Sequence, residues 1–203
     1  MSTNSSIALE GSADAIVEFL ECGLNSILYQ RGVYSSHNFD KTQRFGMTVI
    51  MSNNEELNDY IDQIIQQVRV WIGANKIDRL VLVIKSKETN CAIERWQFNI
   101  NVNEEKDSVN KDEHVVAKKT VKEIQAIIRQ ITASVSFLPI LEENSCTFNV
   151  LVYADKDVEV PTTWSDSDPN LIPGGGEHIR LKSFSTGQHK VDAIVAYRVI
   201  DDI

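Results

Sequence analysis

Residues 92–102 (AIERWQFNINV) alternate between apolar and polar side chains. One set consists of Trp96, Phe98, Ile100 and Val102, and the other of Arg95, Gln97, Asn99 and Asn101. A period of two is typical of a strand with one buried face and one face in water. The stretch therefore predicts an antiparallel sheet that is covered on one side only. It argues against the doubly buried parallel sheet of a nucleotide-binding fold.

Three segments carry apolar residues at helical spacing. The first spans about residues 12–32, with Ser12 as a suitable N-cap, and the second spans about residues 53–73. The third follows residue 114 and has an apolar seam made of Ala117, Val121, Ile124, Ile128, Ile131, Val135 and Leu138. Arg129 lies off this seam, so we expect its side chain to be exposed.

Further short segments have the composition of strands. They are residues 45–51, 80–85 and 146–154, and a hairpin formed by residues 179–184 and 190–200. Residues 155–178 hold three of the four prolines and the triplet Gly174, Gly175 and Gly176, which indicates a long connection. The order of elements predicts a single α+β domain with three helices packed on one face of a mainly antiparallel sheet.

Size and charge narrow the class of protein. A chain of 203 residues suits one large domain or two small ones, and its formal charge of -9 argues against a general nucleic-acid binder. The N-terminal residues lack the pattern of a signal peptide, and the longest aliphatic run, residues 80–84, is too short to span a membrane. We therefore expect an intracellular protein with reduced, buried thiols at Cys22, Cys91 and Cys146.

The sequence shows little sign of catalytic chemistry. The glycine triplet lacks the strand-to-helix context of a phosphate loop, and Val160 stands where a calcium loop around Asp155 and Asp157 would need glycine. The histidines have no metal-ligand spacing. We expect no metal, no cofactor and a binding function, with a hydrolase of the same architecture as an alternative that a pocket of perturbed ionisable groups would favour.

Several segments resemble the HORMA-domain mitotic-arrest-deficient-two family of the spindle assembly checkpoint. They are NSILYQRGVY (25–34), ERWQFNI (94–100), IRQITASVSFLP (128–139), VLVYADKDVEVPTTW (150–164), IRLKSFST (179–186) and HKVDAIVAYR (189–198). The departures fall in the charged loop 103–114, the glycine triplet, the short N-terminus and the acidic end 201–203. The resemblance implies one HORMA domain over residues 1–203, with a core of about 12–154 and a mobile C-terminal safety belt of about 155–203.

The resemblance also implies a function. Members of this family are non-enzymatic switches that convert between an open and a closed fold, capture a linear segment of a partner under the belt, and so delay anaphase. The implied partners are a coiled-coil kinetochore receptor, the β-propeller activator of the anaphase-promoting complex, a checkpoint pseudokinase-type partner, a comet-like adaptor with an AAA-type ATPase, and a second copy in the other state. The implied locations are the nucleus, the kinetochore and the cytoplasm. A HORMA adaptor of another pathway, translesion or meiotic, is the alternative.

Three groups of site residues follow from the resemblance. The strand edge that would pair with the partner contains Phe148, Val150, Leu151, Val152 and Tyr153. The belt would act through Trp164, Ile179, Leu181, Phe184, Val195 and Tyr197. The surface for self-association and for the adaptor would contain Arg129, Gln130 and Phe137, although the ring of Phe137 could instead belong to the core.

The belt hairpin is expected to stay docked on the body of the domain. Burial of Ile179, Leu181, Val195 and Val199 would contribute roughly 6 to 12 kcal/mol. In the closed form of the family, the hairpin lies beside the strand at 92–102 and displaces an N-terminal segment. Residues 7–9 could form that segment as a short strand, or they could be a tail. The glycine triplet either redirects the connection as the hairpin moves or is a tolerated insertion.

Overall fold

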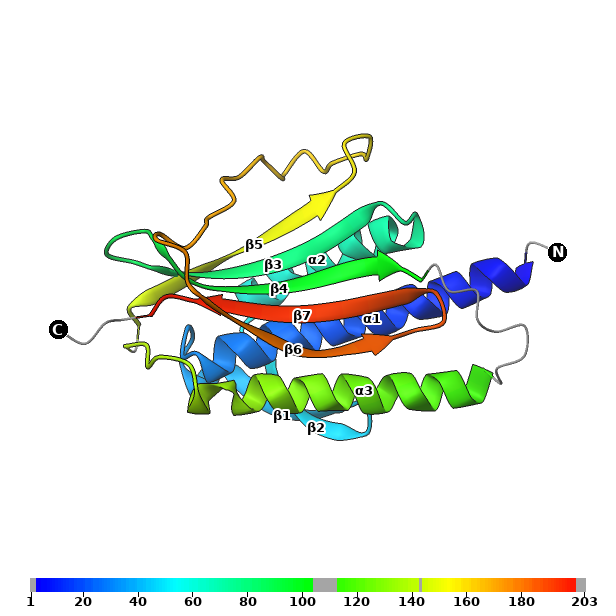
Figure 1. Cartoon of the computed structure of the whole chain (residues 1–203), viewed down its shortest axis with the longest axis horizontal. Helices are drawn as coiled ribbons and strands as arrows, with labels where there is room; N and C mark the ends of the chain where they lie inside the picture. The colour runs from blue at the N-terminus through cyan, green and yellow to red at the C-terminus, as the bar shows by residue number, and fades with distance from the viewer. Residues whose placement is uncertain (1–2, 104–112, 143, 200–203) are drawn as a thin grey trace.

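The computed structural model describes residues 3–103, 113–142 and 144–199 (Figure 1). The helices are α1 (Thr3–Gln30), α2 (Glu55–Gly73) and α3 (Glu113–Ala133), with short 3-10 turns at Ser36–Asn38 and Ser134–Ser136. The strands are β1 (Phe39–Arg44), β2 (Met47–Ser52), β3 (Ile77–Ser86), β4 (Ala92–Val102), β5 (Cys146–Ala154), β6 (Glu177–Ser185) and β7 (His189–Tyr197).

The main sheet has five strands in the order β5-β3-β4-β7-β6, and each neighbouring pair is antiparallel. A separate antiparallel hairpin is formed by β1 and β2. The expected antiparallel sheet is therefore confirmed, and the bounds of β4 and β5 match the predicted segments. Residues 104–112 of the predicted charged loop and the acidic end at 201–203 lie outside the described residues.

The helices lie on one side of the sheet. Figure 1 shows α1 and α2 behind the strands and α3 along the β6 edge. The ring of Phe19 on α1 packs edge-on against Phe98 of β4 and Phe184 of β6, with ring centroids 5.6 and 4.8 Å apart. Because α1 contacts both β4 and the C-terminal hairpin, the core depends on the position of that hairpin.

Two sequence expectations about helix ends were wrong. α1 begins at Thr3, so residues 7–9 belong to a helix and not to a strand. Ser12 does not cap the helix, because its hydroxyl bonds to Thr186 and His189. α3 ends at Ala133, and the 3-10 turn that follows rotates Val135 out of the apolar seam, leaving it 44% exposed.

The outer face of the sheet is partly covered, which also differs from the expectation of a fully wet face. Ile172, from the connection before β6, is buried there against a small cluster that contains Val81, Val83, Leu151 and Ala196. The connection therefore crosses the sheet and adds a second, minor core. The strand predicted at 45–51 corresponds to β2, the second strand of a hairpin. The first strand, β1, was not predicted because it contains too few apolar residues to show a strand pattern.

The thiols match the expectation in part. All three cysteines are free, with Cys22 and Cys146 buried and Cys91 partly buried. Burial raises the pKa of Cys22 to about 12, so this thiol is unreactive at neutral pH. Within the described ranges no helix is long and apolar enough to cross a membrane, and no cluster of metal-ligating side chains occurs.

Candidate peptide-binding edge and belt

The strand β5 forms one end of the main sheet. It pairs with β3 on its inner side, with Val150 opposite Leu82. The backbone N–H of Val150 points away from β3 and donates a hydrogen bond of 3.3 Å to the Tyr60 hydroxyl on α2. Because main-chain groups alternate in an antiparallel strand, those of Phe148 and Val152 face the same open side. This edge can therefore accept a further strand.

A groove of about 330 Å³ runs beside this edge. Its walls come from α2, from β5 and from the connection after β5, and its lining residues include Tyr60, Ile64, Val150, Leu151 and Trp164. The tyrosine is the only ionisable side chain in the lining, and burial raises its pKa. The lining also includes the polar residues Gln63, Asn149, Thr163, Ser165 and Ser167. The groove therefore suits an extended chain that makes both apolar and polar contacts, and its lining contains no acid–base pair for hydrolysis.

The predicted edge residues lie on both faces of β5. The ring of Phe148 packs edge-on against Tyr34 and Tyr60, on the helix side of the sheet. Leu151 is buried on the opposite face, where Tyr153 lies under the guanidinium of Arg79 at 4.3 Å. The edge offers main-chain groups to a partner, and its side chains fix the strand in place.

The connection 155–176 runs back along the outer side of β5 before it enters β6 (Figure 1). The start of this connection is held in place by ion pairs of Lys76 with Asp155 and Asp157. Further along, the ring of Trp164 packs edge-on against Trp71 of α2, with centroids 5.4 Å apart. The predicted belt residue Trp164 thus holds the connection to the helix and also lines the groove.

The hairpin of β6 and β7 lies beside β4 at the other side of the sheet. Leu181, Phe184 and Val195 are buried, whereas Ile179 and Tyr197 are partly buried. The expected burial of Val199 was wrong, because this residue follows the end of β7 and is 46% exposed. In the closed form that the family implies, the hairpin has this position.

The outer edge of β6 is capped by side chains of α3. Gln130 accepts a hydrogen bond from the Lys182 N–H, Glu123 accepts one from the Ser185 N–H, and the Thr120 hydroxyl donates to the Ser185 carbonyl. Gln130, expected at a docking surface, is thus bound to the hairpin. The roles of Thr120 and Glu123 were not predicted, since helical spacing does not show which polar side chains reach a strand.

The other two residues predicted at the docking surface are exposed to solvent. Arg129 is exposed and donates a hydrogen bond to Gln125 one turn earlier. Phe137 is 43% exposed, so its ring is not an ordinary core residue.

A buried polar cluster fixes the tip of the hairpin. His189 is 1% exposed; one ring nitrogen lies 2.8 Å from the Ser12 hydroxyl and the other 2.9 Å from the Asn75 side-chain oxygen. Thr186 completes the cluster through a contact of 2.6 Å to Ser12. Burial lowers the pKa of His189, so its ring is neutral in the folded protein at neutral pH.

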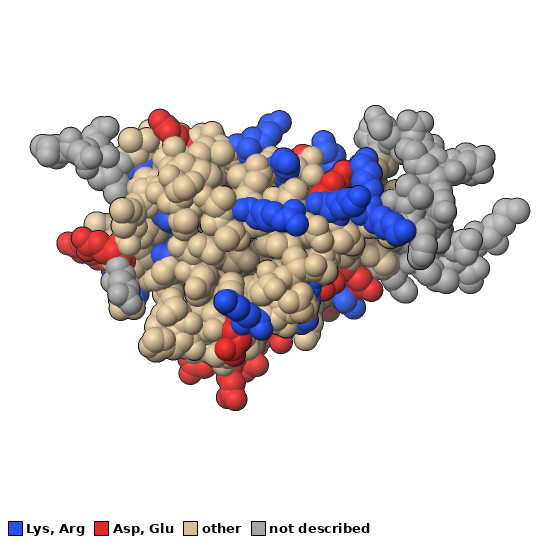
Figure 2. Space-filling view, turned by 90° about the horizontal axis from the view of Figure 1, so that it is seen from below, with Lys and Arg blue, Asp and Glu red and all other residues tan. Residues whose placement is uncertain are grey.

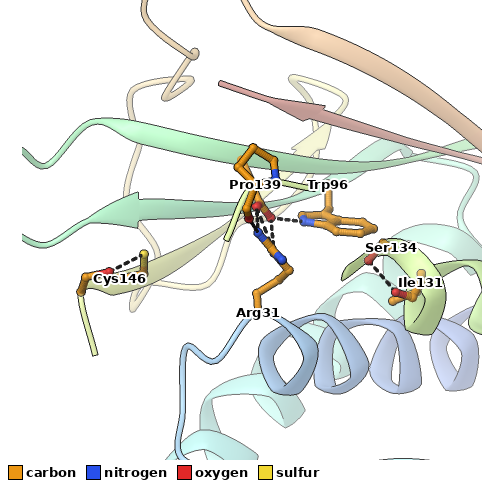
Figure 3. Close-up of polar contacts among 8 residues, drawn as sticks. Arg31, Trp96, Ile131, Ser134, Pro139 and Cys146 are labelled. Carbon is orange, nitrogen blue, oxygen red and sulfur yellow. Dashed lines mark hydrogen bonds and ion pairs between the residues drawn. The ribbon is translucent and has the colours of Figure 1, made fainter. Parts of the chain in front are cut away.

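A buried ion pair joins the end of α1 to β4 (Figure 3). The Arg31 Nε lies 2.9 and 3.1 Å from the two carboxylate oxygens of Glu94, and Trp96 Nε1 donates to the same carboxylate. Arg31 also donates to the carbonyl of Pro139. The sequence could have indicated that Glu94 is buried, because Glu94 falls on the same face of the strand as the apolar residues Trp96 and Phe98.

Comparison with known proteins gives consistent results. A HORMA domain model matches residues 12–189. The mitotic spindle checkpoint component mad2 of Schizosaccharomyces pombe is 48% identical over 196 residues, covering 95% of this chain and 94% of its own. The mitotic spindle assembly checkpoint protein MAD2A of Homo sapiens is 42% identical over 203 residues, covering 98% of this chain and 96% of its own.

Solved structures agree with these relatives. A chain in the crystal structure of a mitotic checkpoint complex superposes with a TM-score of 0.84 at 49% identity, covering 93% of this chain and 99% of that one. C. elegans HTP-2 bound to a HIM-3 closure motif has a TM-score of 0.71 at 15% identity, covering 95% and 92%, which shows a shared fold alone. The chain therefore belongs to the HORMA-domain family, among its mitotic spindle checkpoint MAD2 members.

Proposed function

We propose that this protein is a non-enzymatic switch of the spindle assembly checkpoint that captures an extended segment of a partner along β5. The domain divides into a core of about 12–154 and a belt of about 155–203. The observation that carries the proposal is the pairing of the β6–β7 hairpin with β4, which leaves the outer edge of β5 open beside the belt. A partner strand there gains main-chain hydrogen bonds, while the groove selects its side chains.

The proposed partners follow from the family. They are a coiled-coil kinetochore receptor, the β-propeller activator of the anaphase-promoting complex, a checkpoint pseudokinase-type partner, and a comet-like adaptor with an AAA-type ATPase. Support comes from the similar chain in a mitotic checkpoint complex and from HORMA proteins of the same fold that bind closure motifs. The protein would act at kinetochores and in the nucleus and cytoplasm.

The test of capture uses proline at one edge position. Val150→Pro removes an N–H that faces the open side and leaves the hydrogen bonds to β3 in place. We expect at least tenfold weaker binding of a fluorescein-labelled peptide with the kinetochore receptor's captured segment, measured by anisotropy. Val150→Ala keeps the N–H and serves as the control. Thermal unfolding checks that both variants fold, and unchanged affinity of a folded Val150→Pro variant would exclude strand addition at this edge.

We further propose that an open copy and the adaptor dock on the surface around Arg129, Gln130 and Phe137. Arg129 and Phe137 are both exposed, and arginine and aromatic side chains are suitable interface anchors. Arg129→Glu should weaken self-association in sedimentation velocity without changing peptide affinity. An unchanged dimer population would move the docking surface elsewhere.

A further inference from the structure

A second surface groove lies between α3 and β6, away from the β5 edge. It has a volume of about 520 Å³ and is lined by Lys118, Lys119 and Lys122 of α3, Lys182 of β6, and neighbours that include Glu123 and Ser183. Figure 2, which views the molecule from below, shows basic side chains gathered across this face. Four lysines in one groove are unexpected on a chain with a formal charge of -9.

The single acidic residue in the lining is already engaged. One carboxylate oxygen of Glu123 accepts the hydrogen bond from the Ser185 N–H, and the other lies 3.7 Å from the Lys119 ammonium. Within the described ranges, no carboxylate lies within 4.0 Å of the ammonium groups of Lys118, Lys122 or Lys182. The groove therefore presents a local excess of positive charge.

We propose that this groove binds an acidic linear segment of a partner protein. The spacing of its lysines favours an extended chain with alternating acidic residues. Lys118 and Lys122 are separated along the helix axis by about 6 Å. Alternate side chains of an extended peptide are separated by about 6.6 Å, so successive acidic side chains on one face match successive lysines.

The groove also depends on the position of the hairpin. Three lysines belong to α3, whereas Lys182 belongs to β6. Gln130 accepts its hydrogen bond from the N–H of Lys182 itself, so the fourth lysine is fixed by the contact between helix and hairpin. An acidic segment that contacts all four lysines therefore binds only when the hairpin lies beside β4. Its site is separate from the β5 edge, where the partner peptide is captured.

Charge complementarity favours a protein segment over nucleic acid. The groove is confined to two elements, whereas the chain as a whole is acidic and would repel a long polyanion. A second copy of this chain, also acidic, is the other occupant to be tested.

The probe is a fluorescein-labelled octapeptide of alternating glutamate and serine, with a glutamine-for-glutamate version as its control. Anisotropy at about 50 mM salt should show saturable binding of the acidic peptide alone, weakened at about 300 mM salt. Lys118→Glu/Lys122→Glu should reduce affinity at least tenfold, and Lys182→Glu about threefold. Lys87→Glu/Lys156→Glu changes the net charge as much as the first pair, at exposed sites outside the groove, and should leave affinity within twofold of the wild type.

Four results would overturn the proposal. They are no saturable binding, an equal loss in the Lys87/Lys156 control, no effect of Lys182→Glu, or tighter binding of a single-stranded oligonucleotide of equal length. A fifth is self-association in sedimentation velocity that the Lys118/Lys122 variant abolishes, because the groove would then be an interface between copies. The lysines are exposed, so the variants should fold, and thermal unfolding checks this.

Discussion

Replacing Arg31 with methionine tests the buried ion pair most directly. The side chains of Arg31 and Glu94 are 4% and 1% exposed, so the substitution leaves a carboxylate in the core. Among the residues that the structure describes, Trp96 is then its one remaining side-chain donor. Methionine keeps much of the volume of the arginine stem. Breaking a buried pair from one side costs about 3 to 5 kcal/mol, a large share of the 5 to 15 kcal/mol that stabilises a typical domain.

The charge itself should account for much of that cost. In the Arg31→Met background, Glu94→Gln removes the uncompensated charge and keeps an oxygen for the Trp96 Nε1–H. We expect the double variant to regain about 2 kcal/mol relative to Arg31→Met.

The assay is urea unfolding followed by far-ultraviolet circular dichroism and by tryptophan fluorescence, with coincident transitions as the check on two-state behaviour. The fluorescence comes from three tryptophans, of which Trp96 is bonded to Glu94 through its indole nitrogen. Two results would contradict the reasoning. One is a loss below about 1 kcal/mol for Arg31→Met, and the other is no recovery on adding Glu94→Gln.

Three further predictions concern the belt and its edge. Gly176→Ala should destabilise the fold by about 1 to 3 kcal/mol in urea unfolding, because a Cβ there would lie 2.7 Å from the Tyr197 carbonyl oxygen. Gly187→Ala is the control and should be neutral, because a Cβ there has no atom within 4 Å. Equal effects of the two substitutions would contradict this contact. Stability should fall on acidification below about pH 6.5, by up to about 1.4 kcal/mol per pH unit from His189, because the unfolded state gains a proton that the buried, neutral ring does not take up. His189→Gln should flatten this part of the profile and His178→Gln, at an exposed site, should not; identical profiles for all three proteins would refute the assignment. Tyr60→Phe should tighten peptide capture about twofold in an anisotropy titration, because it removes the hydroxyl that competes for the Val150 N–H; weaker capture would mean that the hydroxyl contacts the partner.

The bounds of β4 were predicted correctly because burial alternates along most of this strand. The bounds of β5 were also correct, although its burial does not alternate regularly, because its composition is typical of a strand. β1 was missed because its residues after Phe39 are largely exposed, so burial leaves no period in the sequence. The extension of α1 to Thr3 was missed because an N-cap residue was assigned from its type, whereas tertiary hydrogen bonds determine the role of Ser12.

The prediction of the candidate site was limited in the same way, because contacts between distant segments cannot be seen in the pattern of one segment. The resemblance predicted a strand edge and a belt, since both are defined by segments that are continuous in the chain. The contacts that hold the hairpin join residues far apart, such as Ser12 with His189 and Glu123 with Ser185. Spacing within one segment carries no information on such pairs, and a polar residue of each pair looks like a surface residue when read alone.

The structure also explains why the hairpin needs a docking place at all times. Leu181, Phe184, Val191 and Val195 are each less than a tenth exposed, and they pack into the main core together with α1. Their burial contributes roughly 6 to 12 kcal/mol, which is comparable to the stability of a whole domain. A hairpin that left β4 without reaching another apolar surface would therefore unfold the protein. Any second state must bury the same side chains elsewhere, and exchange must break the β4 pairing, the α3 caps and the His189 cluster together, so it should be slow.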